Sequence, residues 1–174
     1  MDQFTNLSES EKRELVDKAY QLGYEYLQRY GNCTQCVIAA IQDVFGSIDD
    51  AVIKSGCALA AGYGLTSRAT CGALNGAGMV ISSLQGRDKE NFASGRYGRC
   101  YSQAKNMMNR FIEEYGGCLC YEVQQKIFDG KSYNLSIKEE FIEFEVAGGH
   151  LDKCPAVVGN VAKWVAEMIV EGEI

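Results

Sequence analysis

The sequence predicts an all-α fold: a single-domain helical bundle of about seven to eight helices, in which neighbouring helices are mostly antiparallel. Apolar residues recur at helical spacing along most of the 174 residues, glycines separate these periodic segments, and Pro occurs only once. The connections between segments are short, and short connections make neighbouring helices antiparallel. No Pro/Gly/Ser-rich linker divides the chain, so residues 1–174 are expected to form one domain.

Four helices are expected in the amino-terminal half. Ser8 and Glu11 form a capping box that opens the first, and Asn32 and Asp49 are candidate caps for the second and third. The glycine-containing turn Gly62-Tyr63-Gly64 breaks the third helix before the fourth begins. The expected ranges are about 8–30, 33–45, 50–61 and 71–84.

The carboxy-terminal half is expected to contain four more helices, over about 88–115, 119–128, 137–147 and 154–170. Gly95 and Gly98 mark a point where the first of these kinks or divides. Residues 141–146 alternate in a way that also fits a strand. Pro155 suits the first position of the last helix, where its missing N–H costs nothing.

Composition excludes several classes of function. The net charge of −6 argues against a nucleic-acid partner, because phosphate binding needs a basic face. The amino terminus lacks the basic and apolar regions of a signal peptide, and no apolar stretch approaches the ~20 residues of a membrane helix. We therefore expect a cytoplasmic protein with no membrane partner, in a compartment that keeps thiols reduced.

Eight cysteines are unusual in such a chain and are the candidate working residues: Cys33, Cys36, Cys57, Cys71, Cys100, Cys118, Cys120 and Cys154. Cys100 falls in the middle of a helix and fits a small buried hydrophobe. Structural disulfides are not expected in a reducing compartment, so the set indicates redox chemistry or metal binding.

Four of the cysteines lie at or next to expected helix starts: Cys33, Cys71, Cys120 and Cys154. Exposed N–H groups and the helix dipole stabilise a thiolate there, so lowered cysteine pKa values are expected. Because neighbouring helices alternate in direction, these four starts are also expected to converge at one end of the bundle. Cys100 should remain apart from them.

Other motifs leave alternatives open. Cys33-Thr34-Gln35-Cys36 is a CxxC, but it lacks the second pair of a zinc ribbon and the βαβ setting of a thioredoxin-like site. His150, the only histidine, lies near Cys154 and is either a ligand, a proton donor or an ordinary surface residue.

Gly72 and Gly76 share one helix face, which admits either a cofactor or the backbone of a neighbouring helix. Arg68 precedes that helix. It is either a residue that steadies an anion or a thiolate there, or a solvated side chain.

These residues resemble a known family. The features that carry the resemblance are, in order, Asn32-Cys33 opening a helix, the Gly-Tyr-Gly turn, the run from Thr70 to Ala77 (Thr-Cys-Gly-Ala-Leu-Asn-Gly-Ala), Cys120 and Cys154-Pro155. Together they are similar to the C_GCAxxG_C_C family of redox-active proteins, over about residues 15–170. By order, the four cysteines in the family name correspond to Cys33, Cys71, Cys120 and Cys154. The chain departs from the pattern at Leu65 and Thr66, where more glycine is expected, and its other cysteines are additional.

The resemblance implies redox activity without fixing a substrate or cofactor, and a related region of some multihaem cytochromes is associated with an iron–sulfur centre. Our leading interpretation is an iron–sulfur cluster held by Cys33, Cys71, Cys120 and Cys154, which would pass electrons to a redox partner protein. The first alternative is a metal-free thiol–disulfide oxidoreductase, in which Cys33 attacks and Cys36 or Cys71 resolves. A structural zinc site is the second alternative. The oligomeric state stays open.

Overall fold

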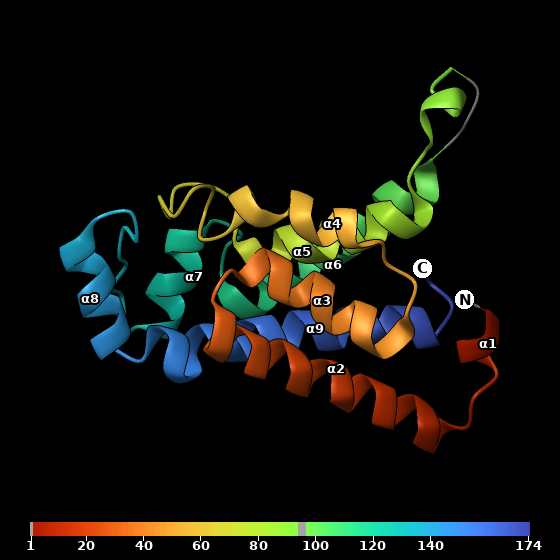
Figure 1. Ribbon diagram of the computed structural model, residues 1–174, viewed down its shortest axis with the longest axis horizontal. Coiled ribbons are helices and arrows are strands. Elements are labelled where there is room, and N and C mark those ends of the chain that lie inside the picture. The colour runs from red at the N-terminus through yellow and green to blue at the C-terminus, as the bar shows by residue number, and fades with distance from the viewer. Residues whose placement is uncertain (1, 94–96) are drawn as a thin grey trace.

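The computed structural model describes residues 2–93 and 97–174, and in these residues it contains helices and no strands, which confirms the all-α prediction (Figure 1). Seven helices have seven or more residues: α2 (Glu9–Tyr30), α3 (Cys33–Phe45), α5 (Gly72–Gln85), α6 (Gly98–Tyr115), α7 (Cys120–Ile127), α8 (Lys138–Val146) and α9 (Cys154–Val170). Shorter elements are α1 (Asp2–Thr5), α4 (Asp50–Ser55), the 3₁₀ turns η1 (Cys57–Leu59) and η2 (Lys89–Asn91), and the π-helical turn η3 (Gly149–Lys153).

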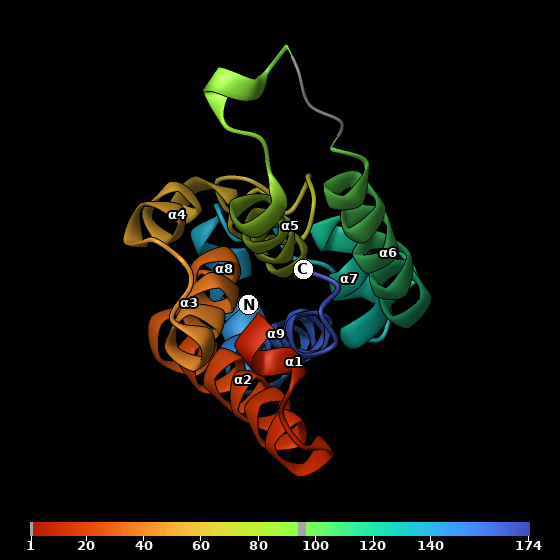
Figure 2. The same ribbon diagram turned by 90° about the vertical axis from the view of Figure 1, so that its right-hand side faces the viewer.

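Along the long axis, α2 and α6 run in one direction and α3, α5 and α9 in the other, while α7 and α8 lie across this axis (Figure 1). The amino ends of α3, α5, α7 and α9 lie toward the end of the molecule that is opposite the two chain termini (Figure 1). Viewed along the bundle, α9 lies among α2, α3 and α5 (Figure 2), and it packs against all three. This arrangement positions the site, because it collects four helix starts at one end.

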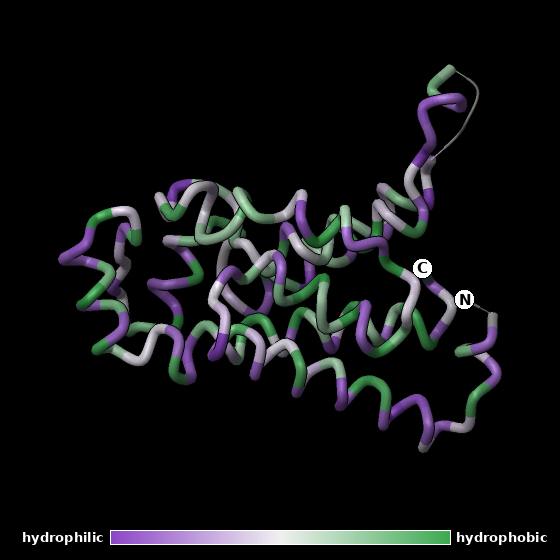
Figure 3. The backbone as a smooth tube through the Cα atoms, viewed as in Figure 1, coloured by the Kyte–Doolittle hydropathy of each residue, from purple (hydrophilic) through white to green (hydrophobic). Residues whose placement is uncertain are grey.

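Two glycines let α2 and α9 cross closely. A Cβ atom on Gly23 would lie 3.0 Å from Ala162 Cβ, and one on Gly159 would lie 3.0 Å from the Tyr20 ring. The buried residues of α2 recur at spacings of three and four, and hydrophilic segments alternate with hydrophobic ones along this helix (Figure 3). Trp164 on α9 is buried in the main core, as expected.

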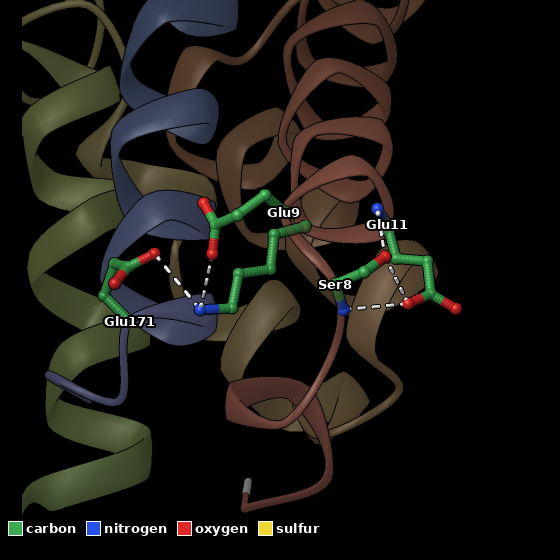
Figure 4. A network of polar contacts seen from close by, with 5 residues as sticks. Ser8, Glu9, Glu11 and Glu171 are labelled. Carbon is green, nitrogen blue, oxygen red and sulfur yellow. Dashed lines mark hydrogen bonds and ion pairs between the residues drawn. The ribbon is translucent and has the colours of Figure 1, made fainter.

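The cap residues predicted from the sequence form hydrogen bonds at the helix starts. Ser8 Oγ accepts a hydrogen bond from the Glu11 N–H, and the Ser8 N–H donates to Glu11 Oε2 at 2.9 Å (Figure 4). Lys12 then pairs with Glu9 at 3.5 Å and with Glu171 at 3.6 Å, which ties the start of α2 to the end of α9. Asn32 and Asp49 cap α3 and α4 through their side-chain oxygens.

The predicted third helix is shorter than expected. It ends at Ser55, and the 3₁₀ turn Cys57–Leu59 follows, so the range 50–61 was wrong beyond its first six residues. Gly56 packs against Thr34 and Ile38. Its N–H donates to Ile53 O, three residues earlier, which is the hydrogen bond of a 3₁₀ turn and ends the α-helix. Ala60 is then extended, and this lets the chain pass beside the starts of α3 and α5.

The predicted helix over 88–115 is also shorter. Only Gly98–Tyr115 forms α6, while Lys89–Asn91 is a separate 3₁₀ turn. The predicted break at Gly98 therefore agrees with the start of α6, whereas Gly95 lies outside the described residues. Residues 137–147 contain the helix α8 and not a strand. In the described part of the chain, no helix has the length and apolar character needed to cross a membrane.

Candidate redox site

The four cysteines at helix starts line one cavity of about 70 Å³. Cys33 and Cys120 are the first residues of α3 and α7, Cys154 is the first residue of α9, and Cys71 is the N-cap of α5. Cys71 and Cys120 are buried, and the other two are half-buried. The geometric expectation from helix alternation therefore holds.

A short antiparallel bridge holds two of the cysteine segments together. Thr70 pairs with Leu119, the Cys71 N–H donates to Cys118 O at 2.8 Å, and the Cys120 N–H donates to Ala69 O at 2.8 Å. Glu122 closes the start of α7 by accepting from the N–H groups of Cys118 and Leu119, both at 2.9 Å. The backbone thus fixes Cys71 and Cys120 beside each other before their side chains are considered.

The glycine face of α5 packs against α3. A Cβ atom on Gly76 would lie 2.8 Å from Thr34 O and 2.8 Å from Val37 Cβ, and one on Gly72 would lie 3.2 Å from Cys33 Sγ. Neither glycine lines the cavity, and their contacts are those of close helix packing, while cofactor contact at Gly72 and Gly76 stays a prediction. Their small size lets α3 approach, and this brings Cys33 to Cys71.

Cys154 reaches the cavity through the π-helical turn η3. Gly148 before this turn has a φ of +91°, and Gly149 has no room for a Cβ atom because one would lie 2.2 Å from the Phe144 ring. Such π-helical turns are often found at functional sites. His150 lies in the turn and lines the same cavity, which places it with the four cysteines.

His150 is oriented by a neighbour that the sequence did not single out. Its Nδ1 lies 2.5 Å from Glu145 Oε1, and its ring meets the Phe144 ring edge-on at a centroid distance of 5.1 Å. A carboxylate on one ring nitrogen fixes the tautomer and leaves the other nitrogen for chemistry. Glu145 lies on α8, where a surface glutamate is ordinarily solvated, so no sequence pattern would have indicated this pairing.

Gln124 and Ser67 are two further site residues that sequence reasoning missed. The buried Gln124 side chain donates to Ser67 Oγ at 3.0 Å and to Cys120 Sγ at 3.5 Å, and it accepts from the Tyr133 N–H at 2.6 Å. The spacing of four residues between Cys120 and Gln124 on α7 was the available indication, because it puts both side chains on one helix face.

Burial raises the pKa of all four cavity thiols, which contradicts the lowered pKa values expected at helix starts. For Cys71, desolvation and the nearby Cys120 and Cys33 thiols raise the pKa, and N–H groups of Ala73 and Leu74 lower it by less. The pKa of Cys120 rises to about 11, again mainly through desolvation. Backbone N–H groups do lower the pKa of Cys33 and Cys71, but the loss of water outweighs them.

The other cysteines lie outside the cavity lining. Cys36 is buried on the far side of the CxxC, where its thiol donates to Gly31 O at 2.9 Å, and burial raises its pKa to about 12. Cys100 is buried in the main core, as expected, and Cys57 is exposed. Arg68 is exposed and does not line the cavity either, so nothing in the structure supports its predicted contact with an anion.

The cavity has room for more than a single ion among its four thiols. The cavity is several times the ~10–15 Å³ that one water needs, and its lining is mainly apolar apart from the thiols, Asn32, Gln124 and His150. In residues 2–93 and 97–174, however, no three His, Cys, Asp or Glu side chains are arranged to hold a metal ion directly. The four thiols therefore line one cavity but are not arranged around one position that a metal ion could occupy.

Comparison with known proteins identifies the family. Residues 31–168 match a family described as "Putative redox-active protein (C_GCAxxG_C_C)". The chain belongs to the C_GCAxxG_C_C family. The matched residues include all four cavity cysteines, and the family is a redox-active one by its description. No curated protein and no solved structure matches the chain.

The run Cys71-Gly72-Ala73, followed by Gly76, lies within the residues that match the C_GCAxxG_C_C family. With this order the cysteine is the N-cap of α5 and the glycine is the residue that faces Cys33 Sγ. The motif therefore combines a cavity thiol with the close helix approach that brings in a second thiol.

Proposed function

We propose that this C_GCAxxG_C_C protein is an electron-transfer protein that holds an iron–sulfur cluster through Cys33, Cys71, Cys120 and Cys154. The observation that carries the proposal is the meeting of four thiols, from the starts of four different helices, in one mainly apolar cavity. Four cysteine thiolates are the usual ligands of such clusters. A bound cluster would supply one-electron redox chemistry, while the surrounding residues exclude water.

The volume of the shared cavity favours a cluster over a single zinc ion. A structural zinc ion needs four ligands at about 2.0–2.3 Å from one point, and no such group is present in the described residues. A cluster brings its own iron and sulfide between the thiolates, so its ligands are further apart. N–H groups also act on the Cys33 and Cys71 thiols, and hydrogen bonds to sulfur tune cluster potentials.

The test is anaerobic reconstitution with iron and sulfide. We expect wild-type protein to bind iron and acid-labile sulfide and to become coloured, and Cys71→Ser to lose most of both. Cys100→Ser is the matched control, because Cys100 is buried but lies outside the cavity. A wild-type protein that binds no iron, or a Cys71→Ser variant that binds as much as wild type, would contradict the proposal; bound zinc without iron would favour the zinc site.

A metal-free thiol–disulfide oxidoreductase is the second candidate, because Cys33 and Cys71 line the same cavity as free thiols. Cys36 is less suited to resolve a disulfide on Cys33, since its thiol donates to Gly31 O outside the cavity. This candidate predicts that colourless, metal-free protein reduces a model disulfide and that Cys33→Ser abolishes the activity. Equal activity in Cys33→Ser would exclude it.

A further inference from the structure

α8 forms one wall of the cysteine cavity, and its other side is exposed to solvent. Phe141 and Phe144 line the cavity from α8, and Phe141 is itself 37% exposed. The opposite face of α8 carries Ile142 and Val146, which are 52% and 85% exposed. In Figure 1 this helix lies at the outer end of the molecule, beyond the starts of α3, α5 and α9.

Apolar residues on both sides of α8 are not explained by packing within the chain. Phe144 is the only residue of α8 that is buried, whereas α2 and α6 each bury a stripe of four residues. The hydrophobic and hydrophilic segments of α8 are intermixed in Figure 3. Leu151, in the adjoining turn, adds a third exposed apolar side chain at 69%. Exposed apolar groups gathered in one place indicate an interaction surface.

This surface is also acidic. Glu139 and Glu143 are exposed and share a helix face with Ile142 and Val146, at spacings of three and four residues. α8 as a whole contains four glutamates and one lysine. We call Glu139, Ile142, Glu143 and Val146 the outer face of α8. Its apolar pair flanked by acidic groups matches the anatomy of small, transient protein interfaces, and its charge selects a basic partner.

We propose that the outer face of α8 docks the redox partner, an electron-carrier protein whose cofactor edge is surrounded by basic residues. This inference rests on the proposed function, because it assumes that the cavity holds a redox group. With a reduced redox group bound in the cavity, one electron would pass through the wall formed by α8 to the oxidised cofactor of the partner. The first centre would be oxidised by one electron and the second reduced by one, and no atom would be transferred.

The test uses a basic c-type cytochrome as the probe, with reconstituted protein that has been chemically reduced under anaerobic conditions. The variant pair is Glu139→Lys with Glu143→Lys, because both side chains are exposed and form no hydrogen bond or ion pair with residues 2–93 and 97–174. At low ionic strength we expect the second-order rate of cytochrome reduction to fall about tenfold or more, and the difference to shrink as salt screens the charges.

The matched control is Glu14→Lys with Asp17→Lys. Both residues are exposed on the amino-terminal half of α2, away from α8 (Figure 1), and the pair changes the net charge by the same amount. The control should slow the reaction by less than about twofold. If the control slows the reaction as much as the α8 variant, or the α8 variant leaves the rate unchanged, the proposal is overturned.

A second readout separates docking from redox chemistry. Backbone amide hydrogen exchange in wild-type protein should slow in α8 when the oxidised cytochrome is added at low salt, and this protection should be lost in Glu139→Lys/Glu143→Lys. Protection of α8 in a protein that binds no iron would support the docking face while the proposed function fails. Sedimentation that shows a dimer of this chain, which dissociates when Ile142 and Val146 are changed to Ser, would assign the face to a second copy and overturn the proposal.

Discussion

At Cys33 and Cys71, two physical effects act on the thiol in opposite directions. The N–H groups at a helix start favour the thiolate, whereas exclusion of water favours the neutral thiol. At Cys71 both effects are present, and desolvation is the larger, so its pKa is raised. A ligand that accepts negatively charged sulfur would reverse this balance, because its positive charge replaces the lost water.

The first prediction concerns thiol reactivity. In metal-free, reduced protein at neutral pH, iodoacetamide should label the exposed Cys57 well before the cavity cysteines, because alkylation requires a thiolate and access. Labelling of Cys71 and Cys154 should accelerate only above about pH 9, the ordinary pKa of the group. Mass spectrometry of peptides measures the rates, with denatured protein as the control. Cavity cysteines that react at neutral pH as fast as Cys57 would contradict the raised pKa.

The second prediction compares two glycines of α5. Gly76→Ala should lower the free energy of unfolding by about 1–3 kcal/mol, because the new methyl group would overlap Thr34 O and Val37 Cβ. Gly78→Ala should raise it by about 0.5–1 kcal/mol, because nothing lies within 4 Å of its Cβ position and Ala favours the helix. Urea denaturation measures both. An increase in the free energy of unfolding for both variants would show that helix propensity, and not overlap with α3, decides the outcome at Gly76.

At the scale of elements, α8 is joined to the rest of the protein mainly through one side chain and one turn. Phe144 packs against Phe128, Tyr133 and His150, in a small cluster separate from the main core. η3 then connects α8 to α9. An element held this way is expected to open at a lower free energy than α9, whose residues lie in the main core.

The third prediction is that α8 opens independently. Its backbone amides should exchange with solvent faster than those of α9, and Phe144→Ala should accelerate exchange in α8 while leaving α9 nearly unchanged. The same substitution should expose the cavity and increase the alkylation rate of Cys154. Ile142→Ala, on the exposed side of the same helix, is the control and should change neither rate. Equal acceleration in α8 and α9 would mean that the two elements open together.

At the scale of the whole molecule, the buried thiols link stability to pH. Their folded-state pKa values are raised above the ordinary value, so the neutral thiols favour the folded state fully below about pH 9. As the pH rises from there toward the folded-state values, the unfolded chain loses its thiol protons first. Metal-free protein should therefore lose stability in alkaline solution.

The fourth prediction tests this linkage. The free energy of unfolding of reduced, metal-free protein should decrease as the pH is raised above about 9, and a variant with Ala at all four cavity cysteine positions should show a smaller decrease. Urea denaturation over a pH series measures both slopes. Parallel slopes for the two proteins would show that other groups, such as the buried Tyr115 with its pKa of about 12, dominate the alkaline transition.

Local signals were sufficient to predict most of the helices. The Ser8–Glu11 box, the Asn32 cap and Pro155 act on neighbouring residues only, so their effect can be read without the fold. The same signals predicted which cysteines begin helices. The errors occurred at 56–61, where Gly56 packs against α3, and at 88–93, where a 3₁₀ turn replaces the expected α-helix.

The sequence by itself determined the all-α class, the helix starts at the four cysteines, and their convergence at one end, because short connections force alternation. Only the tertiary structure decided the direction of the thiol pKa shifts, since water is excluded by residues as distant in the chain as Phe144. It also decided that Cys33 lines the cavity while Cys36 faces Gly31 O, and that His150 pairs with Glu145. These outcomes depend on distances between elements, which no local pattern specifies.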